Sequence, residues 1–449
     1  MKNSRPIVIV GAGPTGIGAA RRLDELDANW LMLEKEGYVG GLSASFVEND
    51  YVWDIGGHVI FSHYDAYDDF LFEAVPPTDW IHHARSAQIL VGDTWVPYPF
   101  QSNLDALPEV QRRLCHEGLE QVHNLANDRS SFGSYIETHF GAGIATLFMR
   151  PYNEKIWAHP LEAMSVDWIR ERVARVQSQS EGTDWGPNNR FRFPAHGGTG
   201  TIWRNAVRRL PGERIQLGTE VARIDAERRE LVTAQGETIA YCALISTMPI
   251  DRLARTAGLT GVAEHIPPLS FTGVHVVGLG ISGAVPEAIE KYCWMYFPEP
   301  GFPFYRATIF SKYSPNNAPP GHWSLMLEVS ESSQRKVRQQ DLIDRCIEAC
   351  IQAQLIRHRR DVVNCWHYRT EYGYPIPTLG RDRALDALHR ALEPMAIFSR
   401  GRFGAWKYEI GNMDHCYMQG REAVDRIVLG TEEMIVHDPE PMHRPGSHS

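Results

Sequence analysis

The strongest constraint on the fold is a glycine-rich turn that joins a short apolar run to a helical one. Residues 7–10 read IVIV, and Gly11, Gly13 and Gly16 then form the pattern GxGxxG. A second apolar run ends at Glu34. In a strand–turn–helix–strand unit the glycines allow a tight turn, a close approach to a pyrophosphate and packing of helix on strand. The pattern predicts a Rossmann-like unit that binds a dinucleotide, with Glu34 on the ribose hydroxyls.

Further glycines favour FAD over NAD as that dinucleotide. Glu34 would repel a 2′-phosphate, and Gly40-Gly41 and Gly56-Gly57 offer bare backbone along which a long cofactor can lie. Near the other end, a helical pattern begins after Asn412, and its N-terminus can face the pyrimidine edge of a reduced flavin. The residues predicted to bind the cofactor are Gly11, Gly13, Thr15, Gly16, Glu34, Gly40, Gly41, Leu42, Gly57, His58, Val221, Arg402, Gly411, Asn412 and Met413.

The pattern along the chain predicts an α/β fold with an interrupted cofactor domain. Segments 1–90, 195–250 and 385–449 together form the expected FAD-binding, Rossmann-like domain. Residues 100–190 are helical in pattern and predict an inserted helical domain. Residues 255–384 contain strand-like runs and predict an antiparallel-sheet substrate domain.

Composition narrows the class of partner. The net charge is −10, which argues against a nucleic-acid or anionic-membrane surface. Seven scattered cysteines without a CxxC motif indicate reduced thiols and predict no metal site. We find no signal peptide and no uncharged apolar stretch of membrane-spanning length, so the sequence predicts a cytoplasmic protein.

Several polar and aromatic residues stand outside any core pattern. Arg306 interrupts the apolar strand FYRATIF, where an unpaired charge is costly, whereas Arg172, on an expected helix over 165–176, and Arg402 read equally well as salt-bridged surface residues. His58 follows the second glycine pair, where it can contact a flavin or be an ordinary satisfied histidine. Hydroxyls and rings that could serve a ligand, or simply belong to the core, are those of Tyr98, Phe100, Trp157, Trp294, Tyr296, Tyr374 and Tyr408.

No Ser-His-Asp arrangement, HExxH or paired carboxylate stands out, so the chemistry is expected to be the flavin's. Arginines combined with tyrosine hydroxyls indicate an anionic, phosphorylated ligand. From these residues alone the reaction stays open.

Long segments of the chain resemble the UDP-galactopyranose mutase family, and its eukaryotic-type branch in particular. The segments, between about Ile7 and Ile427, include GGHVIFSHY, WVPYPFQ, LFMRPYN, WGPN, RFPAHGGTG, PFYRATIFSKYSP, YGYPIPTL and RGRFGAWKYEIGN. The resemblance implies interconversion of the pyranose and furanose forms of a UDP-sugar, most directly UDP-galactose, through an adduct between the sugar and N5 of reduced FAD. NADPH or NADH is the implied reductant, the nucleotide sugar is the partner, and a homo-oligomer is left open.

The resemblance also implies roles for single residues. Arg172 and Arg306 clamp the diphosphate, with His58 as the third catalytic residue. The implied substrate-binding residues are Tyr98, Phe100, Gln101, Asn153, Trp157, Asn188, Tyr296, Tyr374, Arg402, Tyr408 and Asn412. Among these, Tyr98, Phe100 and Gln101 form the uridine pocket with Asn153 and Trp157, and prolines on both sides of Tyr98 stiffen it.

Two features depart from the family pattern. Ala87 stands where eukaryotic members carry a serine for the nicotinamide coenzyme, and the link from Pro315 to Trp323 lacks a long insertion. The first bears on which of NADH and NADPH reduces the flavin, and the second on the oligomer. No motif names the sugar, so a mutase for fucose, arabinose or a GDP- or dTDP-linked sugar stays an alternative, as do an oxidase of the amine-oxidase kind and a non-enzymatic flavin or nucleotide sensor.

Overall fold

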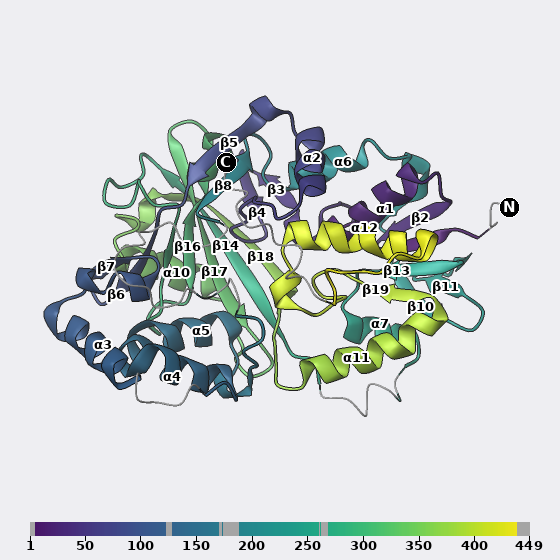
Figure 1. Cartoon of the computed structure of the whole chain (residues 1–449). Coiled ribbons are helices and arrows are strands. Elements are labelled where there is room, and N and C mark those ends of the chain that lie inside the picture. The colour runs from purple at the N-terminus through teal and green to yellow at the C-terminus, as the bar shows by residue number, and fades with distance from the viewer. Residues whose placement is uncertain are drawn as a thin grey trace.

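A five-stranded parallel sheet forms the centre of one lobe (right in Figure 1). Its order is β19 (Ile397–Ser399), β13 (Ala243–Ser246), β1 (Ile7–Val10), β2 (Trp30–Glu34) and β9 (Ile215–Leu217). The computed structural model describes residues 5–122, 128–169, 173, 188–259, 261 and 268–437. β1 is buried at every position and pairs with both β2 and β13, so the glycine turn after it lies at the middle of the sheet edge. The predicted Rossmann-like α/β fold is confirmed.

Two helices from opposite ends of the sequence pack closely beside this sheet. α1 (Pro14–Glu25) and α12 (Met413–Leu429) lie side by side in Figure 1. A β-carbon at Gly18 would collide with the carbonyl oxygen of Tyr417, and one at Gly420 with that of Thr15. The absence of side chains at both positions therefore lets the two backbones touch, and it fixes the start of α12 relative to the glycine turn.

Smaller elements complete this lobe. They are α2 (Asp65–Ala74), α6 (Gly200–Val207), α7 (Ile250–Thr256), α11 (Arg381–Leu392) and the meander β10 (Val221–Asp225), β11 (Glu230–Thr233) and β12 (Thr238–Ala240). The hairpin β3 (Ser45–Glu48) and β4 (Tyr51–Asp54) instead packs Tyr51 and Trp53 into the core of the second lobe. The meander and the closing strand β13 agree with the pattern of the sequence between Ile215 and Ser246.

A seven-stranded sheet forms the second lobe. Its order is β18 (Val362–Pro375), β14 (Phe271–Ser282), β17 (His322–Glu331), β16 (Arg306–Ile309), β15 (Trp294–Tyr296), β6 (Ala87–Val91) and β7 (Thr94–Pro97). All neighbours are antiparallel except β15 and β6. Side chains alternate along β14, so that Val277 and Leu279 pack with α10 (Leu342–Gln352) while Val274 and Val276 face the other core. A two-stranded pair, β5 (Trp80–Ala84) and β8 (Arg190–Pro194), bridges the lobes at the top of Figure 1.

The predicted helical segment lies below this sheet in Figure 1. It contains α3 (Glu109–Val122), α4 (Phe132–Ile144), a π-helical turn (Ala145–Met149) and α5 (Arg150–Trp157). The expected helix over 165–176 is wrong at its start, because residues 165–169 form a turn. Arg172 lies outside the described residues.

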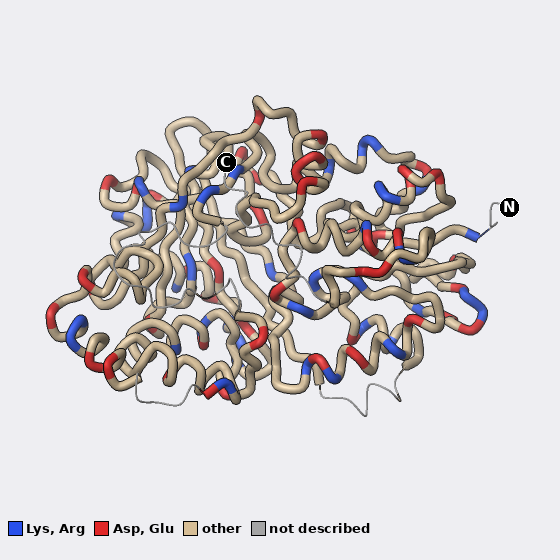
Figure 2. Tube along the Cα trace, in the orientation of Figure 1, with Lys and Arg blue, Asp and Glu red and all other residues tan. Residues whose placement is uncertain are grey.

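Charge is spread over the molecule, with basic and acidic residues interspersed along the trace in both lobes (Figure 2). Among the described helices, none combines the length and the apolar character needed to cross a membrane.

Candidate active site

A cavity of about 380 Å³ lies between the seven-stranded sheet, α5 and the start of α12. Most residues that the sequence predicted for cofactor or substrate line it, although they come from distant parts of the chain. These are Leu42, Gly57, His58, Tyr98, Gln101, Asn153, Trp157, Asn188, Tyr296, Arg306, Tyr374, Arg402, Tyr408, Gly411, Asn412 and Met413. The fold brings these residues to one cavity, whereas the glycine turn, Glu34 and Val221 are not among the described residues that line it.

The glycine turn offers a cradle of bare backbone for a pyrophosphate. Gly11 has a φ of 105°, which only glycine adopts without strain, and a β-carbon at Gly13 would point toward the backbone of Gly40 and Gly41 at 3.9 Å. A side chain at Gly13 would fill the gap between the two glycine segments, whereas one at Gly11 would collide with the side chain of Thr247. The residues present therefore fit a dinucleotide bound at the start of α1.

Glu34 ends β2 beside this cradle. Its carboxylate accepts the N–H groups of Ala12 at 2.6 Å and Glu36 at 2.9 Å. Burial raises its pKa, while the two backbone donors oppose the increase. The amide of Thr219 donates to the Glu34 carbonyl at 2.8 Å, which brings the chain leading to Val221 next to the acid. Two of the predicted cofactor-binding residues, Glu34 and Val221, therefore lie close together at this strand end.

His58 lies on the wall of the cavity, next to the second glycine pair. Its Nδ1 is 3.9 Å from the carboxylate of Asp54. Burial, aided by Arg402 and Arg306, lowers the pKa of His58 to about 4, even though Glu328 acts in the opposite direction. Burial raises the pKa of Asp54 to about 6. At neutral pH the imidazole is neutral and can accept or donate one hydrogen bond toward the cavity.

Arg306 reaches the cavity from β16, and a buried acid on the next strand holds it. Glu328 accepts from Nε of Arg306 at 3.0 Å and from Nη2 at 2.7 Å. It also accepts from the hydroxyl of Tyr305 at 2.6 Å and from the amide of Gly57 at 2.9 Å. Burial alone would raise the pKa of Glu328, but Arg306, Tyr305 and Gly57 lower it, so Glu328 is ionised and accepts only.

Arg402 joins three segments at the other side of the cavity. Its Nε donates to the carbonyl of Gly373 at 3.0 Å and its Nη1 to that of Gly411 at 2.9 Å. Its guanidinium carbon lies 5.1 Å from the ring centre of Tyr374 and 5.7 Å from that of Tyr408. Arg402 thereby places a positive charge where the segment before α12 meets β18.

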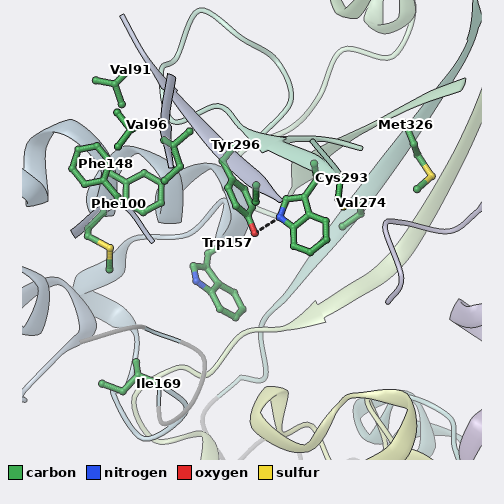
Figure 3. Close-up of a cluster of buried hydrophobic side chains, with 14 of the residues drawn as sticks. Val91, Val96, Phe100, Phe148, Trp157, Ile169, Val274, Cys293, Tyr296 and Met326 are labelled. Carbon is green, nitrogen blue, oxygen red and sulfur yellow. Dashed lines mark hydrogen bonds between the residues drawn. The ribbon is translucent and has the colours of Figure 1, made fainter. Parts of the chain in front are cut away.

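The hydroxyl of Tyr296 has a defined donor direction. The indole Nε1 of Trp294 donates to it at 2.7 Å (dashed in Figure 3). Because an indole nitrogen only donates, the Tyr296 oxygen accepts, and its own proton stays available to a ligand.

Rings and amides surround the end of the cavity near α5. Tyr152 lies between Tyr296 and Phe148, each with ring centres 5.1 Å away. Asn153 donates from Nδ2 to the Met149 carbonyl at 2.7 Å, which orients its Oδ1 as the remaining acceptor of that amide. Flat rings beside an oriented amide suit a planar heterocycle.

Phe100 does not take the position expected of it. Its side chain is fully buried, it is not among the described residues that line the cavity, and its ring stacks on Phe148 at 5.1 Å (Figure 3). Tyr98 and Gln101 on either side of it do line the cavity. The short helical turn that starts at Phe100 directs its ring inward, so it supports Phe148 from behind.

Sequence reasoning missed several residues of the wall. They include Phe61, Phe148, Tyr152, Tyr305, Glu328 and Asp414. For Glu328 a signal existed, because an acid in the apolar strand SLMLEVS invites the same argument that selected Arg306. The aromatic residues carry no such signal, since core aromatics look the same in sequence.

Comparisons with known proteins agree with this geometry. The model of the family described as flavin-containing amine oxidoreductase matches residues 14–428. The crystal structure of a reduced UDP-galactopyranose mutase is 43% identical, covers 98% of this chain and 99% of its own, and superposes with a TM-score of 0.93. This chain belongs to the UDP-galactopyranose mutase group of that family. The two findings together identify the chain as a flavin-dependent isomerase that matches the mutase over nearly its whole length.

More distant structures share the fold alone. A protein of Exiguobacterium sp. 255-15 described as a protoporphyrinogen oxidase is 17% identical with a TM-score of 0.75, covering 96% of this chain and 100% of its own. A putrescine oxidase bound to putrescine is 15% identical with a TM-score of 0.65, covering 95% and 99%. The mutase group thus shares its fold with flavin oxidases, and the residues that line the cavity are what distinguish the two activities.

Proposed function

We propose that the protein interconverts UDP-galactopyranose and UDP-galactofuranose with reduced FAD, and that NADPH or NADH reduces the cofactor. The observation that carries this proposal is the cavity wall, where two arginines and directed tyrosine hydroxyls face rings and an oriented amide. The two guanidinium groups on this wall disfavour a cationic amine substrate, because like charges repel. The eukaryotic-type branch, a cytoplasmic location and the division into three domains at the boundaries given above are further parts of the proposal.

The phosphate end of the ligand is assigned to Arg306, Arg402 and Tyr296. Arg306 and Arg402 supply positive charge, and Tyr296 supplies the proton that Trp294 leaves free. In a cavity with little water such groups stabilise a diphosphate as it leaves the sugar. Arg172 is part of the proposed clamp through the resemblance.

The base is assigned to Tyr98, Gln101, Tyr152 and Asn153. The rings provide stacking surfaces, and the Asn153 oxygen can accept from the imide N–H of uracil. Arg85 lies over the ring of Tyr98 at 5.1 Å and donates to the side chain of Asn188 at 2.7 Å, which holds both residues at this end. Phe100 acts through Phe148.

The sugar then lies between these ends, beside the flavin-facing residues His58 and Asn412. Bound in its reduced form, FAD supplies the nucleophilic nitrogen for chemistry at the anomeric carbon. Neutral His58 can orient a sugar hydroxyl without competing for the diphosphate charge.

One experiment tests the proposal. Protein reduced with dithionite under anaerobic conditions is incubated with UDP-galactofuranose, and the products are separated by chromatography. We expect UDP-galactopyranose from the reduced protein and none from strictly oxidised protein. Hydrogen peroxide release from a small amine in air, without any sugar product, would instead identify an oxidase.

A further inference from the structure

Glu328 is a buried acid at the centre of the cavity wall. It lies in β17, is 1% exposed, and has Leu327 and Val329 as sequence neighbours in the core beneath α10. Its carboxylate receives hydrogen bonds from two separate segments, through Gly57 and through the adjacent residues Tyr305 and Arg306. Burial without such partners would be costly, so these contacts have to form together.

The first consequence concerns the part of Arg306 that a ligand can reach. Nε and Nη2 are both bonded to Glu328. Among the described residues, Nη1 forms no hydrogen bond that would compete with a ligand, and Arg306 lines the cavity. Glu328 thus holds the planar guanidinium by one edge and leaves the other edge for an anion.

The second consequence concerns charge. An ionised Glu328 directly beside Arg306 largely cancels the positive charge that a diphosphate would feel at this wall. The pair therefore orients the Arg306 donor well but weakens the electrostatic attraction between Arg306 and the diphosphate. Tight ground-state binding does not accelerate a reaction, whereas correct geometry at the leaving group does.

The third consequence concerns the segment Gly56 to His58, which we call the flavin loop because it is expected to face the cofactor. The same Glu328 oxygen that binds Arg306 accepts the amide of Gly57, next to His58. One carboxylate therefore fixes the position of Arg306, the donor for the phosphate, relative to the flavin loop. Tyr305 connects this network to Tyr374, because the hydroxyl oxygens of the two tyrosines lie 3.2 Å apart.

We infer that Glu328 is a positioning residue, which orients Arg306 relative to the flavin loop and reduces ground-state attraction for the diphosphate. The inference rests on the proposed function, because it assumes that a nucleoside diphosphate occupies the cavity. It predicts an effect that a merely structural acid would not have: removing the charge should strengthen binding of the nucleotide while slowing the reaction.

The test compares Glu328→Gln with Glu331→Gln as a matched control. Glu331 lies on the same strand, is also buried, and pairs with Arg369, but it does not line the cavity. UDP is titrated into each reduced protein, and kcat is measured with UDP-galactofuranose. For Glu328→Gln we expect about threefold to tenfold tighter UDP binding and at least a roughly tenfold lower kcat. Glu331→Gln should stay within about twofold in both.

Bound FAD serves as the check that each variant is folded. If Glu328→Gln does not retain FAD, Glu328→Asp decides, since it keeps the charge but shortens the reach. UDP affinity should then stay within about twofold of the wild type while kcat falls at least about fivefold. UDP binding that weakens in step with kcat in either Glu328 variant would refute the inference. Failure of the wild type to bind UDP would refute the proposed function instead.

Discussion

Replacing Gly420 with alanine should damage the cofactor site from a distance. The new β-carbon would collide with the carbonyl oxygen of Thr15, which is backbone in the first turn of α1 and cannot rotate away. The helices must separate, and overpacking of this kind costs about 1–3 kcal/mol. Alanine recovers up to about 1 kcal/mol through its higher helix propensity. We therefore expect a net loss of up to about 2 kcal/mol together with weaker retention of FAD.

The assay follows thermal unfolding by flavin fluorescence and measures bound FAD after gel filtration. Gly212→Ala is the control, because a β-carbon there meets nothing within 4 Å and its φ is not positive. The control should match the wild type or gain about 0.4–1 kcal/mol. If Gly420→Ala keeps full FAD occupancy and unfolds at the wild-type temperature, close packing of α1 on α12 does not position the site as we argue.

Three further predictions concern the cavity. Phe100→Ala removes a fully buried ring and should cost about 3–5 kcal/mol of stability, with weaker UDP binding as Phe148 relaxes; urea unfolding of the apoprotein measures the loss, and unchanged stability would contradict it. Arg306→Ala should lower kcat/KM at least about a hundredfold, or about 2.7 kcal/mol, as steady-state kinetics can show; near-normal turnover would remove Arg306 from the clamp. Burial lowers the pKa of His58 to about 4, so its contribution to the free energy of unfolding is complete above its unfolded pKa of about 6.5 and is lost as the pH falls toward 4. His58→Asn should therefore flatten the plot of unfolding free energy against pH in this range. A plot parallel to that of the wild type would disprove the argument.

The sequence was sufficient wherever a residue type has few structural uses. Gly11 and Glu34 are required by the turn and the strand end, and Arg306 stood out because a charge in an apolar strand needs a partner. The α/β fold followed from the apolar runs and the glycine turn between them. These inferences use local sequence only, and local sequence decides backbone shape and burial.

Other features depend on contacts between distant segments and could not be read from one sequence. Gly18 and Gly420 look like ordinary helix glycines until the two helices are placed side by side. If the chain were extended here, Phe100 would point to the same side as Tyr98. The short helical turn that starts at Phe100 instead directs its ring into the core. The helix expected from residue 165 failed because apolar spacing alone does not exclude a turn.

The order of strands in the parallel sheet has a consequence for how the protein is made. β1 needs β13 as its neighbour, β13 needs β19, and the glycine turn is completed by α12, which ends at Leu429. During translation the sheet and the glycine turn therefore stay incomplete until β13, β19 and α12 have been synthesised. The helical layer, with its nearby contacts, can form earlier, whereas the dinucleotide cradle closes last. A product truncated before α12 would lack the helix that packs on α1, so we expect it not to retain flavin.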